Sequence, residues 1–410
     1  MARAWQAGFG RAWAMRGRHE IMTRQPASSE RRIDDIEVLR GLSVLMILVS
    51  HLRQSLIPWA VPWWDHVTKY YFDLWPAVDL FFAISGFVIA RTLLPAVRAG
   101  LAAGQAPRAL LAFWVRRAWR ILPSAWLWLW LMLLQSAVFN RSGAVDTFHA
   151  NFEATIAGML SIANFRLAYM FHQFGYGMST HYWTLSLEEQ FYAVLPLAVL
   201  FCGRYLAVVL IVGLLALAAT PQSDMLMCCR AQPLILGVLL AMAAETKAFA
   251  LFEPVALARS RLARLAAFGL PLLCMTAVAA AAQRITTHPA DVVAVLVLVL
   301  VFIACFDRNC IPPRGILRPL MLWAGTRSYA LYLCHLSVFY GAREFWLRMA
   351  PAGTKFGPGW GPTLIATAVV VLVVVAELNF RIVERPLRRR GARIARGIWP
   401  GAAVHATASA

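Results

Sequence analysis

Apolar runs, each about 20 residues long, recur between residues 37 and 380, and a helix of that length crosses the hydrocarbon core of a bilayer. Hydrophobic residues make up 60% of the 410-residue chain and charged residues only 14%, so the apolar surface is too large for one water-soluble core. The sequence therefore predicts an all-α membrane protein, a bundle of about ten transmembrane helices. The predicted helices lie near residues 37–57, 75–95, 119–139, 183–202, 205–220, 230–245, 265–283, 290–306, 319–340 and 361–380.

Basic residues are concentrated in alternate connections between these runs. Short cytoplasmic loops retain Lys and Arg, and most of the 39 basic residues fall on one side when the N-terminus is placed in the cytoplasm. Both termini are therefore predicted to be cytoplasmic, residues 1–32 as a basic disordered tail and residues 389–410 as a C-terminal tail. This topology and the anionic inner leaflet explain the net charge of +19. We therefore expect membrane lipid, and not nucleic acid, beside the basic residues.

Arg40 and His51 lie eleven residues apart in the first apolar run. At about 100° and 1.5 Å per residue, they share a helix face to within about 20° and are about 16 Å apart along the axis. Ionisable groups inside a bilayer usually face a bundle interior or a watery cavity and mark a pathway or a reaction site. The alternative is that Arg40 snorkels to the membrane surface and His51 only makes a helix contact.

Asp79 and Gly86 lie seven residues apart in the second run, and hence on one helix face. The missing side chain of Gly86 allows a neighbouring helix or a ligand to approach closely. Asp79 is either a member of a site on that face or an N-terminal helix cap at the outer membrane surface.

Arg116, Arg117 and Arg120 stand close together at the start of the third predicted helix. Arginines three apart on a helix occupy adjacent faces and can jointly bind a phosphate or diphosphate through planar, bidentate contacts. Retention of basic residues on the cytoplasmic side explains the same cluster without a ligand.

Two later runs also carry polar residues at helical spacing. Glu188 and Tyr192 are four apart and share a face, although the two acids Glu188 and Glu189 could also simply be hydrated at the outer membrane surface. Ser328, Tyr332 and His335 follow at steps of four and three, so that a hydroxyl, a phenol and an imidazole line one stripe. A hydrogen-bonded core histidine is the default interpretation of that stripe.

The seven cysteines show neither a disulfide framework nor the spacing of a zinc site. The sequence also lacks a Walker loop, H-E-x-x-H and G-x-S-x-G. We therefore expect no metal.

Several of these segments resemble, in order, the motifs of acyltransferase family 3, the integral-membrane acyltransferases that modify bacterial surface glycans. The resemblance covers about residues 33–388, which we take as one transmembrane domain, and several motifs in order are more specific than any one alone. Larger family members carry an appended periplasmic domain that is not seen after this region. The similar segments are residues 36–41 with His51, 78–82 with 85–87, 116–117 with 120–123, 183–192, 328–333 with His335, and 383–386.

The resemblance implies an enzyme of the bacterial inner membrane that transfers an acyl group, usually acetyl, from cytoplasmic acyl-CoA (acetyl-CoA) to a hydroxyl of a carbohydrate or glycolipid acceptor. A base or nucleophile of neutral pKa suits that chemistry, which favours His51. Together with the stripes above, it predicts His51, Glu188 and Asp79 as catalytic residues, Arg40, Arg116, Arg117 and Arg120 as the binding site for the CoA end of the donor, and Tyr192, Tyr332 and His335 as substrate contacts.

A proton-coupled transporter or a lipid-linked sugar flippase is the alternative, because such proteins also bury Arg, Asp, Glu and His. No inverted repeat is visible, and a basic loop suits a phosphate-bearing donor better than a carrier gate. The sequence leaves open the identity of the acceptor, the length of the acyl group, the choice between direct transfer and an acyl-enzyme, and the oligomeric state.

Overall fold

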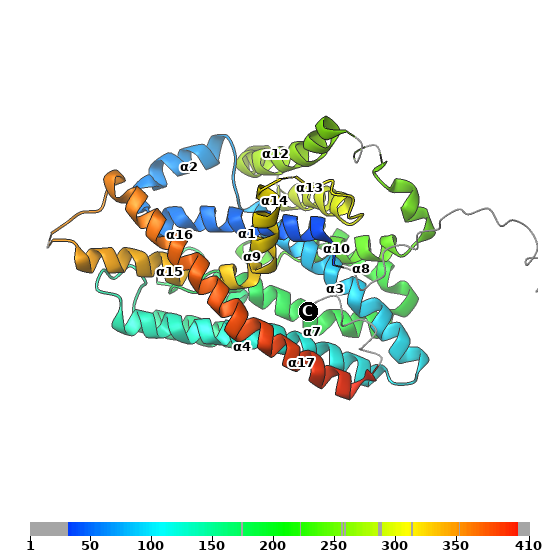
Figure 1. Cartoon of the computed structure of the whole chain (residues 1–410). Coiled ribbons are helices and arrows are strands. Elements are labelled where there is room, and N and C mark those ends of the chain that lie inside the picture. Colours follow the sequence, from blue (N-terminus) through cyan, green and yellow to red (C-terminus); the bar gives the residue numbers. More distant parts are fainter. Residues whose placement is uncertain are drawn as a thin grey trace, which may run out of the picture.

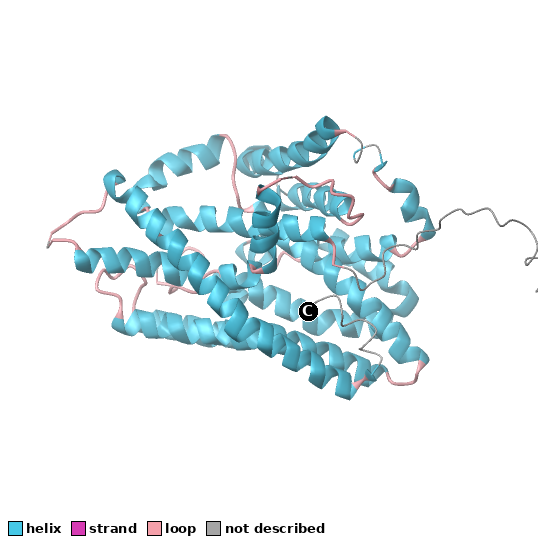
Figure 2. Ribbon diagram, in the orientation of Figure 1, coloured by secondary structure: helices cyan, strands magenta, loops and turns pink. Residues whose placement is uncertain are grey.

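The computed structural model describes residues 32–400, except 174, 222, 256, 258–259, 286–288, 313–314 and 352. Nearly all of the predicted N-terminal tail and the last part of the predicted C-terminal tail lie outside the described residues. Within them, every regular element is a helix, and helices connected by loops make up the whole bundle (Figure 2). The predicted all-helical class is confirmed.

The α-helices follow one another with mostly short connections. Short 3₁₀-helices occur at Pro58–Ala60, Gly203–Tyr205, Lys247–Phe252 and Pro358–Trp360, and a π-helical turn at Asn379–Glu384 joins the last two helices. The helices are α1 (Asp34–Ser55), α2 (Val61–Tyr70), α3 (Pro76–Ala102), α4 (Ala106–Val138), α5 (Phe148–Met159), α6 (Ala163–Met170), α7 (Tyr182–Cys202), α8 (Leu206–Ala219), α9 (Asp224–Cys228), α10 (Gln232–Ala244), α12 (Arg261–Ile285), α13 (Pro289–Ala304), α14 (Leu317–Thr326), α15 (Ser328–Met349), α16 (Gly361–Leu378) and α17 (Arg385–Ile398).

Five helical stretches of the described chain are long and apolar enough to cross a membrane, and two shorter apolar helices accompany them. The first helix, α1, is long enough but carries charged residues along its length, Asp34, Asp35, Glu37, Arg40 and Arg53. Each of the ten predicted runs falls largely within helix, and five stretches are candidate membrane spans by length and composition, so the figure of about ten crossings stays a prediction. The five stretches are α3, α4, Tyr182–Ala219, Arg261–Ala281 and Pro358–Ile398.

The ninth predicted helix, residues 319–340, is wrong as a continuous element. The chain breaks at Arg327, so that α14 ends at Thr326 and α15 runs on to Met349. The guanidinium of Arg327 donates two hydrogen bonds to Glu377 of α16, at 2.9 and 3.2 Å, and lies over the ring of Phe380. This tertiary contact holds Arg327 outside helical geometry, which sequence periodicity does not reveal.

The second and third helices are longer than predicted, because α3 continues to Ala102 and α4 begins at Ala106. Their extended ends pack against α17, which includes the first part of the predicted C-terminal tail. Figure 1 shows α4 and α17 side by side. The two helices meet near the loop that connects α3 to α4, at the end of the bundle away from the loop that connects α15 to α16. The residues of this small apolar cluster are Ala96, Ala109, Ala112, Ala395 and Trp399.

Glycines bring the inner helices into backbone contact. A Cβ atom at Gly86 of α3 would collide with the carbonyl group of Leu234 in α10, and one at Gly237 of α10 would collide with that of Ala83. The prediction that Gly86 allows a close approach is therefore confirmed, and the neighbour is a helix. Helix α1 packs against α3, α13, α14 and α15, which places this helix inside the bundle (Figure 1), and its Arg40 and His51 are both partly buried.

Candidate functional site

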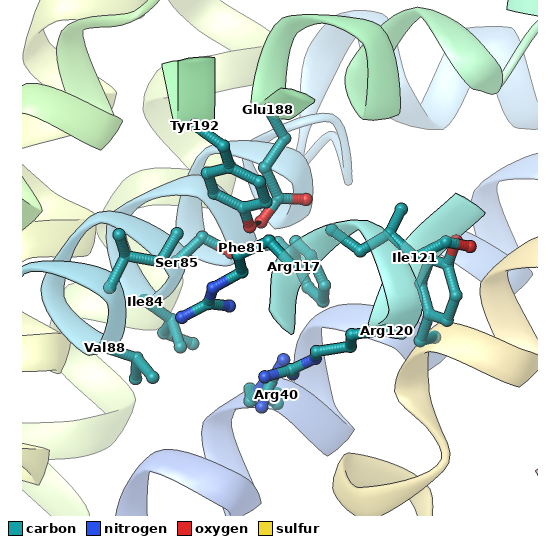
Figure 3. A pocket seen from close by; sticks show the side chains of 12 residues that line it. Arg40, Phe81, Ile84, Ser85, Val88, Arg117, Arg120, Ile121, Glu188 and Tyr192 are labelled. Atoms are coloured by element: carbon teal, nitrogen blue, oxygen red, sulfur yellow. Dashed lines mark hydrogen bonds between the residues drawn. The ribbon is translucent and has the colours of Figure 1, made fainter. Parts of the chain in front are cut away.

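A pocket lies between α1, α3, α4, α7 and the start of α15. It contains several of the residues that the sequence singles out, from segments far apart in the chain (Figure 3). One side is apolar and the other carries the charged groups. The residues that line it are Arg40, Phe81, Ile84, Ser85, Val88, Ile89, Arg117, Arg120, Ile121, Glu188, Tyr192 and Tyr329.

Three guanidinium groups converge on this pocket, from Arg40 of α1 and from Arg117 and Arg120 of α4. Figure 3 shows the side chain of Arg120 extended toward Arg40. Arg40 donates a hydrogen bond to Glu37 at 3.4 Å, whereas Arg117 and Arg120 form no ion pair with any other described residue. Like charges held together in a partly buried space repel each other, so the arrangement favours an anion in the pocket.

Arg116 does not line the pocket, although it precedes Arg117. Arg117 instead lies against aromatic rings, with its guanidinium carbon 5.3 Å from the centre of Tyr192 and 5.6 Å from that of Phe113. These cation–π contacts fix the direction of the guanidinium group and leave its hydrogen-bond donors available.

Glu188 and Tyr192 form the wall of the pocket that α7 supplies (Figure 3). The Tyr192 hydroxyl donates a hydrogen bond to the Glu188 carboxylate, which confirms that the two residues share a helix face. Glu188 is partly buried and lines the pocket together with Arg117 and Arg120.

A cluster of imidazoles lies deeper along α1 and α15. The Nδ1 atom of His51 is 2.7 Å from the Nε2 atom of His335, and the ring of His181 packs edge-on against His335 with 4.9 Å between centroids. Tyr332 completes the cluster, because its hydroxyl bonds the His181 carbonyl at 2.7 Å and the Thr184 hydroxyl at 2.6 Å. The predicted stripe on α15 thus faces His51.

Phe81 links the arginine pocket to the imidazole cluster. Its ring lies under the guanidinium of Arg40, 5.8 Å away, and beside the ring of Tyr332, with 6.5 Å between centroids. Helix α1 carries both Arg40 and His51, and α15 carries a residue of the pocket, Tyr329, as well as His335. The pocket and the imidazole cluster are therefore neighbours, connected through Phe81.

Asp79 lies apart from the residues that line this pocket. It is fully buried and accepts a hydrogen bond from Arg230 at 2.7 Å, and the guanidinium of Arg230 lies between the rings of Trp75 and Trp183. Asp79 makes no side-chain capping bond at the start of α3. The structure thus brings eight of the ten predicted site residues to the pocket or to the imidazoles, and places Asp79 and Arg116 elsewhere.

Sequence reasoning missed His181 and Phe81, and also the pairing of His51 with His335. His181 stands two residues before the fourth predicted helix, where no pattern assigns it a role, and His335 is 284 positions from His51. Among the described residues, no group of three or more His, Cys, Asp or Glu side chains is arranged to hold a metal ion.

Residues 33–378 match the profile of a protein family described as an acyltransferase domain. YrhL of Bacillus subtilis, assigned as a peptidoglycan O-acetyltransferase, is 24% identical over 390 residues, which are 88% of this chain and 56% of YrhL. The peptidoglycan O-acetyltransferase OatA of Listeria monocytogenes is 24% identical over 398 residues, 90% of this chain and 58% of that protein. The O-acetyltransferase OatA of Staphylococcus aureus is 22% identical over 393 residues, 88% and 58% of the two chains.

The chain spans just over half the length of these relatives. No solved structure matches it significantly. The matched region includes the arginine pocket and the imidazole cluster and ends before α17. It also decides between the enzyme and the transporter that the sequence left as the alternative. The chain belongs to the acyltransferase 3 family of membrane O-acyltransferases.

Proposed function

We propose that this enzyme transfers an acyl group, in the first instance acetyl, from cytoplasmic acyl-CoA to a hydroxyl of a cell-surface glycan or lipid-linked sugar at the bacterial inner membrane. The observation that carries the proposal is the convergence of Arg40, Arg117 and Arg120 on one pocket, joined through Phe81 to a partly exposed imidazole. Two relatives with peptidoglycan O-acetyltransferase in their names support a cell-wall glycan as the acceptor.

The donor fits both the arginine pocket and the imidazole cluster. CoA carries a diphosphate and a further phosphate at one end, which suit the guanidinium groups of Arg117 and Arg120, neither of which forms an ion pair with another described residue. Its thioester is at the far end of a long, flexible arm. With the phosphates at Arg117 and Arg120, that arm passes Phe81 and brings the thioester toward His51, about 16 Å from Arg40 along α1. Arg116, outside the pocket, adds positive charge on the approach.

His51 is the catalytic base in this proposal. It takes the proton of the acceptor hydroxyl while the hydroxyl oxygen attacks the thioester carbonyl carbon. The carbon–sulfur bond then breaks, and the leaving thiolate takes the proton from the imidazolium, which yields the ester and CoA. A two-step transfer through an acyl-imidazole would use the same ring.

The remaining residues orient the substrates. Glu188, between Tyr192 and the arginines, polarises or orients the substrate bound in the pocket, and Tyr332 contacts the acceptor near the imidazoles. We assign Asp79 a structural role, because its partner is Arg230. Such a site lets a cytoplasmic donor meet an acceptor presented from the outer side of the membrane.

Transfer from radiolabelled acetyl-CoA to solubilised peptidoglycan fragments, measured in proteoliposomes, tests the proposal. We expect CoA release to depend on the acceptor, and His51→Ala to lower the rate by about 10²-fold or more. His149→Ala is the matched control, because that imidazole is 82% exposed on α5. Full activity of His51→Ala would remove this residue from the mechanism, and solute counterflow without acyl-CoA would favour a carrier.

A further inference from the structure

The proton positions on His51 and His335 follow from the atoms around them. The Nδ1 atom of His335 is 2.6 Å from the backbone carbonyl oxygen of Tyr332, and its Nε2 atom is 2.7 Å from Nδ1 of His51. The two ring planes differ by 5° and the centroids are 5.0 Å apart. Parallel rings at that separation, with nitrogens in contact, meet edge to edge, which is the geometry of an in-plane N–H···N hydrogen bond.

A carbonyl oxygen only accepts hydrogen bonds, so the Nδ1 atom of His335 must carry a proton. A neutral imidazole has a single N–H group, and Nε2 of His335 is therefore an acceptor. The hydrogen on the 2.7 Å contact then belongs to Nδ1 of His51. The reverse arrangement would set two lone pairs against each other at the Tyr332 carbonyl. The Nε2 atom of His51 consequently has no proton and a free lone pair.

The two histidines differ in access. His335 is completely buried, and its ring is held by edge contacts with His181 and Phe339, at 4.9 and 5.8 Å between centroids. His51 is only partly buried. Of the two rings, only that of His51 belongs to a residue with exposed surface, so we assign the two imidazoles different tasks.

We propose that His335 is a positioning residue that holds His51 in the Nδ1–H tautomer and so presents Nε2 of His51 as the reactive nitrogen. When Nε2 takes the acceptor proton, the Nδ1–H group stays bonded to His335, whose lone pair stabilises the imidazolium. An Asp does this in the Ser-His-Asp triad. Here the neutral ring of His335, which is hydrogen-bonded to the backbone carbonyl of Tyr332, takes the place of that Asp. The resting state then holds no buried charge at this position.

The assignment of Nε2 as the base rests on the proposed function, whereas the tautomer does not. Nitrogen NMR of ¹⁵N-histidine-labelled protein in nanodiscs reads the tautomer directly, with the His51 signals assigned by their loss in His51→Gln. We expect a protonated Nδ1 and an unprotonated Nε2. A wild-type His51 protonated on Nε2 would overturn the inference, whether or not transfer to a glycan is found.

Three variants separate positioning from mere packing. His335→Leu removes the acceptor, so we expect loss of the Nδ1–H preference and a fall of about 10²-fold in kcat, with KM for acetyl-CoA within about twofold. His335→Gln restores an amide carbonyl and should recover part of kcat. Tyr332→Phe keeps the backbone carbonyl and should leave the His51 tautomer as it is.

These variants should all elute as monodisperse protein, which shows that the fold is intact. A folded His335→Leu protein with wild-type kcat would contradict the inference. Loss of CoA binding in the same variant would also contradict it, because it would show that His335 acts on the pocket as a whole.

Discussion

The carboxylate of Asp79 accepts a hydrogen bond from the guanidinium of Arg230 at 2.7 Å, across 151 positions of sequence. Both side chains are buried, and the pair joins α3 to the segment that leads into α10. The tryptophan rings on either side of Arg230 exclude water from the pair. Removal of one partner leaves the other charge buried without compensation, which is more costly than the net benefit of the pair.

We therefore expect Asp79→Ala to lower the free energy of unfolding by about 3 kcal/mol or more. The matched control is Asp65→Ala, since Asp65 also pairs with an arginine, Arg53 at 2.6 Å, but is 59% exposed, and its loss should cost less than about 1 kcal/mol. Denaturation of both variants in detergent measures the difference. A fully stable Asp79→Ala protein without transferase activity would instead show that Asp79 is a catalytic residue.

The contact between Gly86 and the backbone of α10 leads to a second prediction. A methyl group at Gly86 collides with the Leu234 carbonyl, so Gly86→Ala should destabilise the bundle by about 1–3 kcal/mol. Gly213 of α8 has no atom within 4 Å of a built Cβ, and Gly213→Ala should be neutral or stabilising by up to about 1 kcal/mol. Thermal unfolding curves compare the two, and equal melting temperatures would show that α3 and α10 are less closely packed.

Arg117 should contribute to donor binding through charge-assisted hydrogen bonds, each worth about 1.5–3 kcal/mol. Arg117→Ala is expected to raise the Kd for CoA by about 10-fold or more, and added salt should weaken wild-type binding. Arg98→Ala, which removes a 59% exposed arginine paired with Glu245, should bind CoA as the wild type does. Equilibrium binding of labelled CoA distinguishes them. An unchanged Kd in Arg117→Ala would show that the arginine cluster does not bind CoA and reflects only the retention of basic residues on the cytoplasmic side.

Phe81 should limit the size of the acyl group, because its ring lines the arginine pocket and lies beside Tyr332, where the proposed path of the thioester passes. Phe81→Ala opens space there, so we expect the ratio of kcat/KM for butyryl-CoA to that for acetyl-CoA to rise about 10-fold or more. Phe345→Ala, at a ring 45% exposed on α15, should leave the ratio unchanged. If both variants keep the wild-type ratio, the acyl group does not pass Phe81.

Helical periodicity predicted which residues of one helix share a face. It placed Arg40 and His51 on one side of α1, Glu188 beside Tyr192, and a close approach at Gly86, and the structure has each of these. Such relations depend only on the geometry of a single helix, which the sequence determines locally.

Periodicity does not identify the neighbouring helix. The pairs His51–His335 and Asp79–Arg230, and the break at Arg327, arise from contacts between helices far apart in the chain. The sequence predicted Asp79 either as a site residue or as a helix cap, and nothing local pointed to Arg230, although a buried carboxylate needs a partner. For the same reason, no local pattern predicted His181 or Phe81 as a site residue. Both rings pack beside Tyr332 in the folded protein.

A density map of the enzyme in nanodiscs with a non-hydrolysable thioether analogue of acetyl-CoA tests the central claim most directly. The account predicts the diphosphate in hydrogen-bond contact with Arg117 and Arg120, and the acyl end of the analogue beside Nε2 of His51. A map with the analogue bound elsewhere, or with the ring of His51 packed against lipid and closed off from the arginine pocket, would contradict it.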